Sequence, residues 1–171
     1  MSSRAAEKLA DIPFATMLVM GLCIAVYGYQ ILVDPQLRDF TMCPSLVIKN
    51  HELYRIFTAC LFHSSPRHIA MNMMSTYVIG TSLERQIGTL TMSLTIILGM
   101  IFTGIVKISI SLILASWGLE VMMMRHSLGF SGVIFQLLVL DCNLRPDRSE
   151  KLFGLMTVSS KAYPWASVRP C

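Results

Sequence analysis

Charged residues are scarce in this sequence. Asp, Glu, Lys and Arg make up 14% of the 171 residues, and hydrophobic residues make up 54%. A typical soluble domain has about 25% charged residues and roughly 45–50% apolar ones. This high apolar content excludes a disordered chain. The sequence has no Lys/Arg-rich run, which excludes a basic nucleic-acid-binding domain. The composition is that of a membrane protein.

The sequence also lacks the residue spacings of a metal site or a disulfide framework. Its five cysteines contain no CxxC pair and leave one over, whereas both kinds of site depend on regular, paired spacings. No HExxH sequence is present either, which argues against a zinc protease. We therefore expect no metal, no cofactor and no nucleic-acid partner.

Long uncharged runs dominate the rest of the chain. Residues 12–33 form a run of 22 and residues 86–106 a run of 21, and about 20 apolar residues span a bilayer as a helix. The shorter runs 68–83 and 126–140 predict two further spans. A signal peptide is the competing interpretation of 12–33, but that run exceeds the roughly 7–15 residues of a signal core, and no small-x-small cleavage site ends it.

The segments between these runs complete the predicted fold. Residues 35–67 mix charged residues with three prolines and predict a long ordered loop with short amphipathic pieces. Residues 108–119 are too short to span alone and predict a loop or interfacial segment, and 152–168 is a candidate stub of a fifth span. The predicted fold class is all-α, a polytopic membrane helical bundle of four spans plus this stub, in one domain over 1–171.

Polar side chains at membrane depth mark the candidate site. His68 and Asn72 are four residues apart, so they share one face of the second predicted span. They can hold the bundle together by interhelical hydrogen bonds, or they can be donors aimed at a reacting oxygen. The spacing alone leaves both interpretations open.

A Gly-x-Ser-Gly sequence, formed by Gly129, Ser131 and Gly132, lies early in the fourth run. A serine at a helix N-terminus has unpaired backbone N–H groups beside it, and these can stabilise an oxyanion. The alternative is that Ser131 caps the helix and that the glycines permit close packing. Both interpretations stay open here as well.

Two features of the second span concern structure. Glu84 and Arg85 follow its uncharged run and predict that the helix stops at a membrane boundary there. Thr76 and Gly80 are four residues apart and predict a small-xxx-small surface for contact with another helix.

In their order, these features resemble the rhomboid family of intramembrane serine proteases. The matching sequences are YRIFT at 54–58, LFH at 61–63, HxxxNM at 68–73, LERxxG at 83–88 and GFSG at 129–132. The resemblance covers roughly residues 12–166. It looks closest to the small eukaryotic rhomboids of the endoplasmic reticulum, so we expect a multi-pass protein of the endoplasmic reticulum or another endomembrane.

The resemblance implies roles for individual residues. Ser131 matches the nucleophile, and His68 and Asn72 match the side chains that form the oxyanion hole together with the Ser131 N–H. Gly129 and Gly132 belong to the same motif, in which Gly132 leaves room for the catalytic histidine. The family's structural motifs match three more residues: Arg55, Glu84 and Arg85.

The catalytic base of the family is not found in this chain. In the family it is a histidine on a sixth helix, and here no histidine follows His126; we therefore expect the family's C-terminal helices to be missing from this sequence. One hypothesis is an intramembrane serine endopeptidase that cleaves client proteins in or near a transmembrane segment, through an acyl-enzyme on Ser131. The other is a non-catalytic rhomboid-like protein that binds transmembrane clients. Both imply transmembrane client proteins and membrane lipid as partners.

Overall fold

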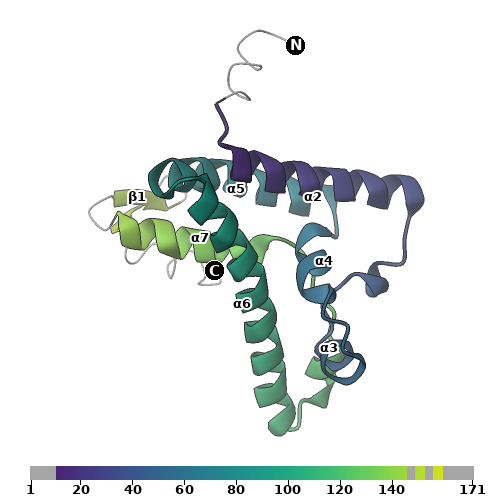
Figure 1. The fold of residues 1–171 in the computed structure, drawn as a ribbon. Coiled ribbons are helices and arrows are strands. Elements are labelled where there is room, and N and C mark those ends of the chain that lie inside the picture. Colours follow the sequence, from purple (N-terminus) through teal and green to yellow (C-terminus); the bar gives the residue numbers. More distant parts are fainter. Residues whose placement is uncertain (1–10, 146–148, 153–155, 160–171) are drawn as a thin grey trace.

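The computed structural model describes residues 11–145, 149–152 and 156–159. Helices are the main regular elements among these residues, and one antiparallel pair of strands accompanies them (Figure 1), which agrees with the predicted helical class. The paired strands are β1 and β2. The elements in chain order are α2 (Phe14–Val33), η1 (Leu37–Asp39), α3 (Pro44–Asn50), α4 (Arg55–Leu61), α5 (Pro66–Ile87), α6 (Thr89–Ser116), η2 (Glu120–Met124), α7 (Ser131–Leu144), β1 (Ser149–Leu152) and β2 (Met156–Ser159).

Helices α2 and α5 lie side by side (Figure 1). Their backbones approach closely at Gly80, where an added Cβ would lie 2.9 Å from both Cγ2 and Oγ1 of Thr16. Thr76, one turn earlier on α5, is fully buried. Gly80 of the predicted small-xxx-small surface therefore contacts α2.

Glu84 fastens the beginning of α2 to α5. Its carboxylate accepts hydrogen bonds from the backbone N–H groups of Ala15 (2.9 Å) and Thr16 (2.8 Å), and from the Thr16 hydroxyl (2.7 Å). The Thr89 hydroxyl donates a further bond of 2.8 Å. The first N–H groups of a helix have no partner within the helix, so this buried carboxylate supplies the cap that α2 lacks.

The Glu84–Arg85 pair does not end its helix, which corrects the sequence prediction. Helix α5 continues to Ile87 and ends at Gly88, whose φ of 82° lies in the left-handed region. Of these two residues, Arg85 is the exposed one, and its guanidinium pairs with the Asp11 carboxylate at 3.1 Å. Glu84 can stay inside the helix because its charge is satisfied by α2.

Helix α6 is longer than predicted. It begins at Thr89 rather than at residue 86, and it continues through the expected loop or interfacial segment 108–119 as far as Ser116. Lys107 does not end the span, because one lysine does not break a helix and neither proline nor glycine occurs between Lys107 and Gly118. At 1.5 Å per residue, 28 residues give about 42 Å, and α3 and η2 pack beside α6 (Figure 1).

Helix α7 begins at Ser131 and not at residue 126. Residues 125–129 are not helical: Ser127 pairs with Met42 through two backbone hydrogen bonds, and Gly129 has a φ of 113°. The candidate stub 152–168 lies mostly outside the described residues. Its described parts, Leu152 and Met156–Ser159, belong to strands and not to a helix.

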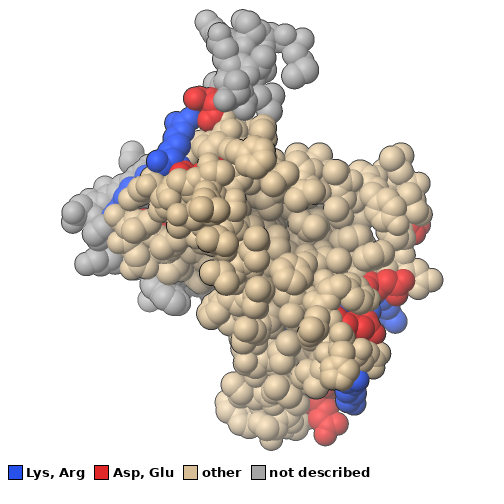
Figure 2. Space-filling model, viewed as in Figure 1, with Lys and Arg blue, Asp and Glu red and all other residues tan. Residues whose placement is uncertain are grey.

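Two helices, α2 and α6, are long and apolar enough to cross a membrane. Helix α7 is apolar but has 14 residues, and α5 carries several polar side chains. On the face shown in Figure 2, charged side chains gather near the beginning of α2 and around the α3–α4 region, with a broad uncharged surface between them. Large apolar side chains stand exposed on this fold, among them Leu32, Leu90 and Leu98, as expected for contact with lipid.

Candidate active site

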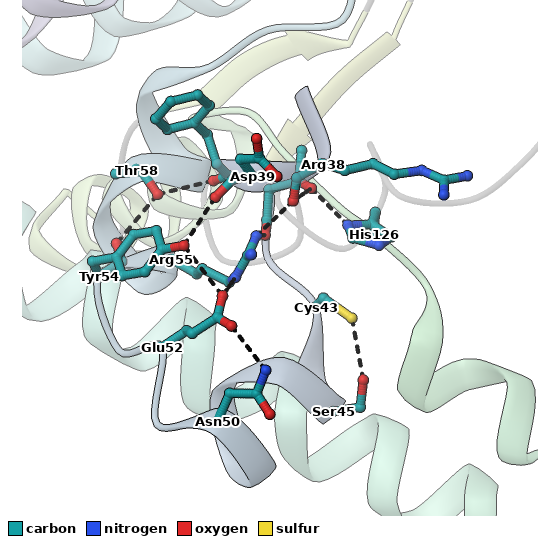
Figure 3. A network of polar contacts seen from close by, with 12 residues as sticks. Arg38, Asp39, Cys43, Ser45, Asn50, Glu52, Tyr54, Arg55, Thr58 and His126 are labelled. Carbon is teal, nitrogen blue, oxygen red and sulfur yellow. Dashed lines mark hydrogen bonds and ion pairs between the residues drawn. The ribbon is translucent and has the colours of Figure 1, made fainter. Parts of the chain in front are cut away.

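Arg55 organises the loop that precedes the site (Figure 3). Its side chain is 4% exposed, and its guanidinium donates to the carbonyl oxygens of Arg38 (2.6 Å) and Thr41 (2.9 Å) and to the Glu52 carboxylate (2.5 Å). Hydrogen bonds from Asn50 and from Arg55 hold the pKa of Glu52 below its ordinary value. Arg55 thus satisfies buried loop carbonyls, as the structural motif implies.

The same loop holds the segment that leads into α7. The Thr41 hydroxyl lies 2.7 Å from Nδ1 of His126, and Met42 pairs with Ser127. The Gly129 N–H then donates to the carbonyl of Ala59 in α4, at 2.7 Å. These contacts fix the backbone just before Ser131.

His68 and Asn72 lie in the first two turns of α5. The helix begins at Pro66 because Ser65 caps it, with its hydroxyl accepting from the His68 N–H at 3.2 Å. Nδ1 of His68 lies 3.0 Å from the Ser64 hydroxyl, which leaves Nε2 available to another partner. Both residues therefore present polar groups at the same end of α5.

His63, which lies in the loop between α4 and α5, is a further member of this cluster. Its Nε2 lies 2.9 Å from Nδ2 of Asn72, and its Nδ1 lies 3.0 Å from the Leu61 carbonyl. Because both neighbours fix the roles of the ring nitrogens, His63 is the neutral tautomer with the proton on Nδ1. Burial, and secondarily the nearby His68, lowers the pKa of His63, which favours this neutral form.

Gln30 of α2 clamps the backbone of His63. The Gln30 amide donates to the His63 carbonyl (2.9 Å) and accepts from the His63 N–H (3.0 Å). Its spacing gave no sign of this role, because Gln30 stands near the end of an apolar run. For His63, the sequence signal was a second histidine only five residues before the candidate His68, in the loop that leads into α5.

Gly129 brings the Gly-x-Ser-Gly sequence against α5. An added Cβ would lie 2.6 Å from Cε1 and 2.7 Å from Nε2 of His68, and 3.6 Å from Nδ2 of Asn72. Real Cβ atoms do not approach so closely, and the φ of 113° also favours glycine. The structure therefore brings together His68, Asn72 and the loop that carries Ser131.

Ser131 is the first residue of α7 and does not cap it. The N-cap position is Phe130, with no side-chain cap, and the Ser131 side chain makes no hydrogen bond within the described part of the chain. The side chain is exposed. An accessible hydroxyl beside the positive end of a helix dipole can act as a nucleophile when a base takes its proton.

Gly132 permits contact between α7 and α6. A Cβ there would lie 2.5 Å from Cγ2 and 3.0 Å from Oγ1 of Thr103, so among the described residues the neighbour of Gly132 is a threonine and not a histidine. Gln136 strengthens this contact by donating to Thr103 Oγ1 (2.7 Å) and to the Gly99 carbonyl (3.0 Å). Two sequence signals accompany this contact. Gly99 and Thr103 are four residues apart on α6, and Gln136 is the one glutamine in the fourth uncharged run.

A cavity of about 300 Å³ opens beside Ser131. It is bounded by α4, by α6 and by the segment from Ser127 to Gly132, and its lining is mostly apolar. Within the described ranges, no group of three or more His, Cys, Asp and Glu side chains could hold a metal ion. The arrangement thus offers a hydroxyl, an imidazole, an amide and a cavity, which are the parts of an acyl-transfer site.

Comparison with known proteins identifies the source of this arrangement. The family model described as "Rhomboid domain" matches residues 50–170, well over half of the chain. The chain is similar to "Rhomboid-like protein 15" of Arabidopsis thaliana, with 29% identity over 169 residues that cover 96% of this chain and 42% of the relative. It is also similar to "Rhomboid protease GlpG" of Yersinia pestis (strain Pestoides F), with 25% identity over 124 residues that cover 72% of this chain and 40% of the relative. The chain therefore spans about two fifths of the length of these relatives, and it belongs to the rhomboid family.

Proposed function

We propose that this chain carries the nucleophile and oxyanion parts of an intramembrane serine endopeptidase, which cleaves client proteins in or near a transmembrane segment. The observation that carries the proposal is the contact at Gly129, which sets the Ser131 loop against His68 and Asn72. Family membership and the similarity to a protein named as a rhomboid protease support it.

Each group has a distinct role in the proposed reaction. The Ser131 hydroxyl attacks the scissile carbonyl and forms an acyl-enzyme, releasing the amine. The carbonyl oxygen, as it becomes an oxyanion, accepts hydrogen bonds from the Ser131 N–H, from His68 Nε2 and from Asn72 Nδ2. Preorganised donors of this kind contribute about 10²–10³ in rate each.

His63 makes Asn72 a fixed donor. An amide nitrogen has two hydrogens, and the bond to His63 Nε2 uses one of them. The other hydrogen then has a set direction. Since Gln30 clamps the His63 backbone, we assign His63 as a positioning residue that acts through Asn72.

The proton of Ser131 needs a base that these 171 residues do not provide after His126. His126 itself is engaged with Thr41, and His68 serves as an oxyanion donor in the proposal. The proposal takes the base from sequence outside these 171 residues, since the chain spans about two fifths of the length of its relatives. Without it, the same fold would bind transmembrane clients without cleaving them, which is the competing function.

The membrane topology is part of the proposal. Helices α2 and α6 span the bilayer, and α5 and α7 complete a four-span bundle in which their polar groups face inward, because polar groups are costly in contact with lipid. At about 21 Å, α7 is shorter than the roughly 30 Å hydrocarbon core, so Ser131 lies below one membrane surface. We place the protein in the endoplasmic reticulum or another endomembrane, on the resemblance stated above.

Labelling with a fluorophosphonate probe tests the nucleophile. In a purified form that contains the base, we expect covalent labelling that Ser131→Ala abolishes, and that Ser127→Ala, a change of a serine in the same cavity, leaves in place. Equal labelling of the wild type and Ser131→Ala would remove Ser131 from the role. A wild type that binds a client peptide but is not labelled would support the competing function.

The intact mass of the endogenous protein tests where the base comes from. We expect a mass above 19.1 kDa, with sequence beyond Cys171 that carries a histidine on a membrane helix. An endogenous protein of 19.1 kDa that ends at Cys171 would contradict the assignment of the base to the same polypeptide.

A further inference from the structure

Lys107 is the one charged side chain among the described residues that line the cavity beside Ser131. It is also the one charged residue in the 28 residues of α6. Thr103, Gly104, Lys107 and Ile110 all line the cavity, and their spacing puts them on one face of the helix. Lys107 therefore faces the same space as the proposed nucleophile.

Nothing in the described part of the chain neutralises Lys107. It is half-buried, and it has no ion pair or hydrogen bond with a described residue. It lies about 27 Å along α6 from Thr89, so a hydrocarbon core of roughly 30 Å that begins at Thr89 ends close to Lys107. A cation in such a place is normally paired or functional.

The cavity fits a side chain better than it fits a whole lipid. Its volume of about 300 Å³ is at the lower end of the range for ligand pockets, roughly 300–1,000 Å³. Its walls come from α4, α6 and the Ser131 loop, and Ile56 of α4 closes against Gly104. An apolar cavity with one cation suits a short aliphatic chain that ends in a carboxylate.

We infer that Lys107 selects clients that carry an aspartate or glutamate close to the bond presented to Ser131, at the membrane boundary. This inference rests on the proposed function, and it names the clients that the site takes. The client carboxylate pairs with the ammonium group of Lys107, and its methylene groups contact the apolar walls. The same charge repels clients with lysine or arginine at that position, so selection has both an attractive and a repulsive part.

Binding measurements in the Ser131→Ala background test the inference without cleavage. The affinities of fluorescent transmembrane peptides, each with one Asp at a scanned position near the membrane boundary, are measured in neutral phosphatidylcholine vesicles. Each peptide is compared with an otherwise identical peptide that has Asn at the same position. At one position we expect the Asp peptide to bind about tenfold more tightly, the size expected for one charge-assisted hydrogen bond. Lys107→Met should remove the preference, Lys107→Arg should keep it, and Lys107→Glu should favour a Lys peptide.

Lys49→Met is the matched control, because Lys49 is an exposed lysine on α3 that does not line this cavity. Equal affinity for every Asp and Asn pair, or a preference that survives Lys107→Met, would overturn the inference. Binding to anionic phosphatidylserine vesicles that Lys107→Met abolishes, with no Asp preference, would overturn it in favour of a lipid phosphate.

The two proposals fail in different ways. An Asp preference that depends on Lys107, together with a wild type that neither cleaves the peptide nor reacts with the probe, keeps this inference and rejects the protease. Cleavage of Asp and Asn peptides at equal rates and with equal affinities keeps the protease and rejects this inference.

Discussion

Gly129→Ala perturbs the contact on which the proposed site depends. The new Cβ would lie 2.6 Å from Cε1 and 2.7 Å from Nε2 of His68, so either the imidazole or the loop must move. An L-residue at a φ of 113° also carries backbone strain. Strain of about 1–2 kcal/mol and overpacking of about 1–3 kcal/mol together predict a loss of about 2–5 kcal/mol.

Gly118→Ala separates the two contributions. Gly118 has a φ of 87°, but nothing lies within 4 Å of its Cβ position. This substitution therefore adds strain without a clash, and we expect a loss of about 1–2 kcal/mol. The difference between the two variants then measures the contact with His68 alone.

Reversible unfolding in mixed detergent micelles measures the free energies, and probe labelling of Ser131 measures the effect on the site. We expect Gly129→Ala to slow labelling, because a displaced His68 no longer donates to the oxyanion, and Gly118→Ala to leave labelling unchanged. If Gly129→Ala costs no more than Gly118→Ala and labels as fast as the wild type, the contact is not part of the site.

Three further predictions test other parts of the structure. Glu84→Gln should lower the free energy of unfolding by about 1–3 kcal/mol, because a buried carboxylate loses part of its bonding to α2, whereas the exposed Glu120→Gln should be neutral in the same unfolding assay. In a form that contains the base, His68→Ala and Asn72→Ala should each slow peptide cleavage by about 10²–10³-fold; unchanged rates would leave both with a packing role only. The lowered pKa of His63 means that the unfolded chain takes up a proton near pH 6.5 that the folded chain refuses, so stability should fall as the pH drops from 7 to 5.5. His63→Gln should flatten that pH profile, and a profile already flat in the wild type would contradict the assignment.

Much of the fold follows from local sequence. The uncharged runs predicted where α2 and the first part of α6 lie, and spacing alone placed His68 with Asn72 and Thr76 with Gly80. Helix boundaries were less predictable, because a charged residue beside an apolar run does not always end the helix. Lys107 and Glu84 both stand inside helices, and in the case of Glu84 the partner that allows this is about 70 residues away in sequence.

The candidate site was only half visible from the sequence, for a related reason. His68, Asn72 and the glycines stand out because polar or small residues are conspicuous in apolar helices. Gln30 does not stand out, because a polar residue near the end of a helix is common. Its role arises from a tertiary contact with the His63 backbone that no local pattern encodes.

The cap that Glu84 provides has a consequence for biosynthesis. The backbone N–H groups of Ala15 and Thr16 emerge from the ribosome 69 and 68 residues before the carboxylate that accepts from them. At about 5–20 residues per second, α2 waits roughly 3–14 s for this cap. Until then the N–H groups at the N-terminal end of α2 have water, lipid headgroups or the insertion machinery as hydrogen-bond partners. The pairing of α2 with α5 is therefore the step at which that end becomes satisfied from within the described part of the chain.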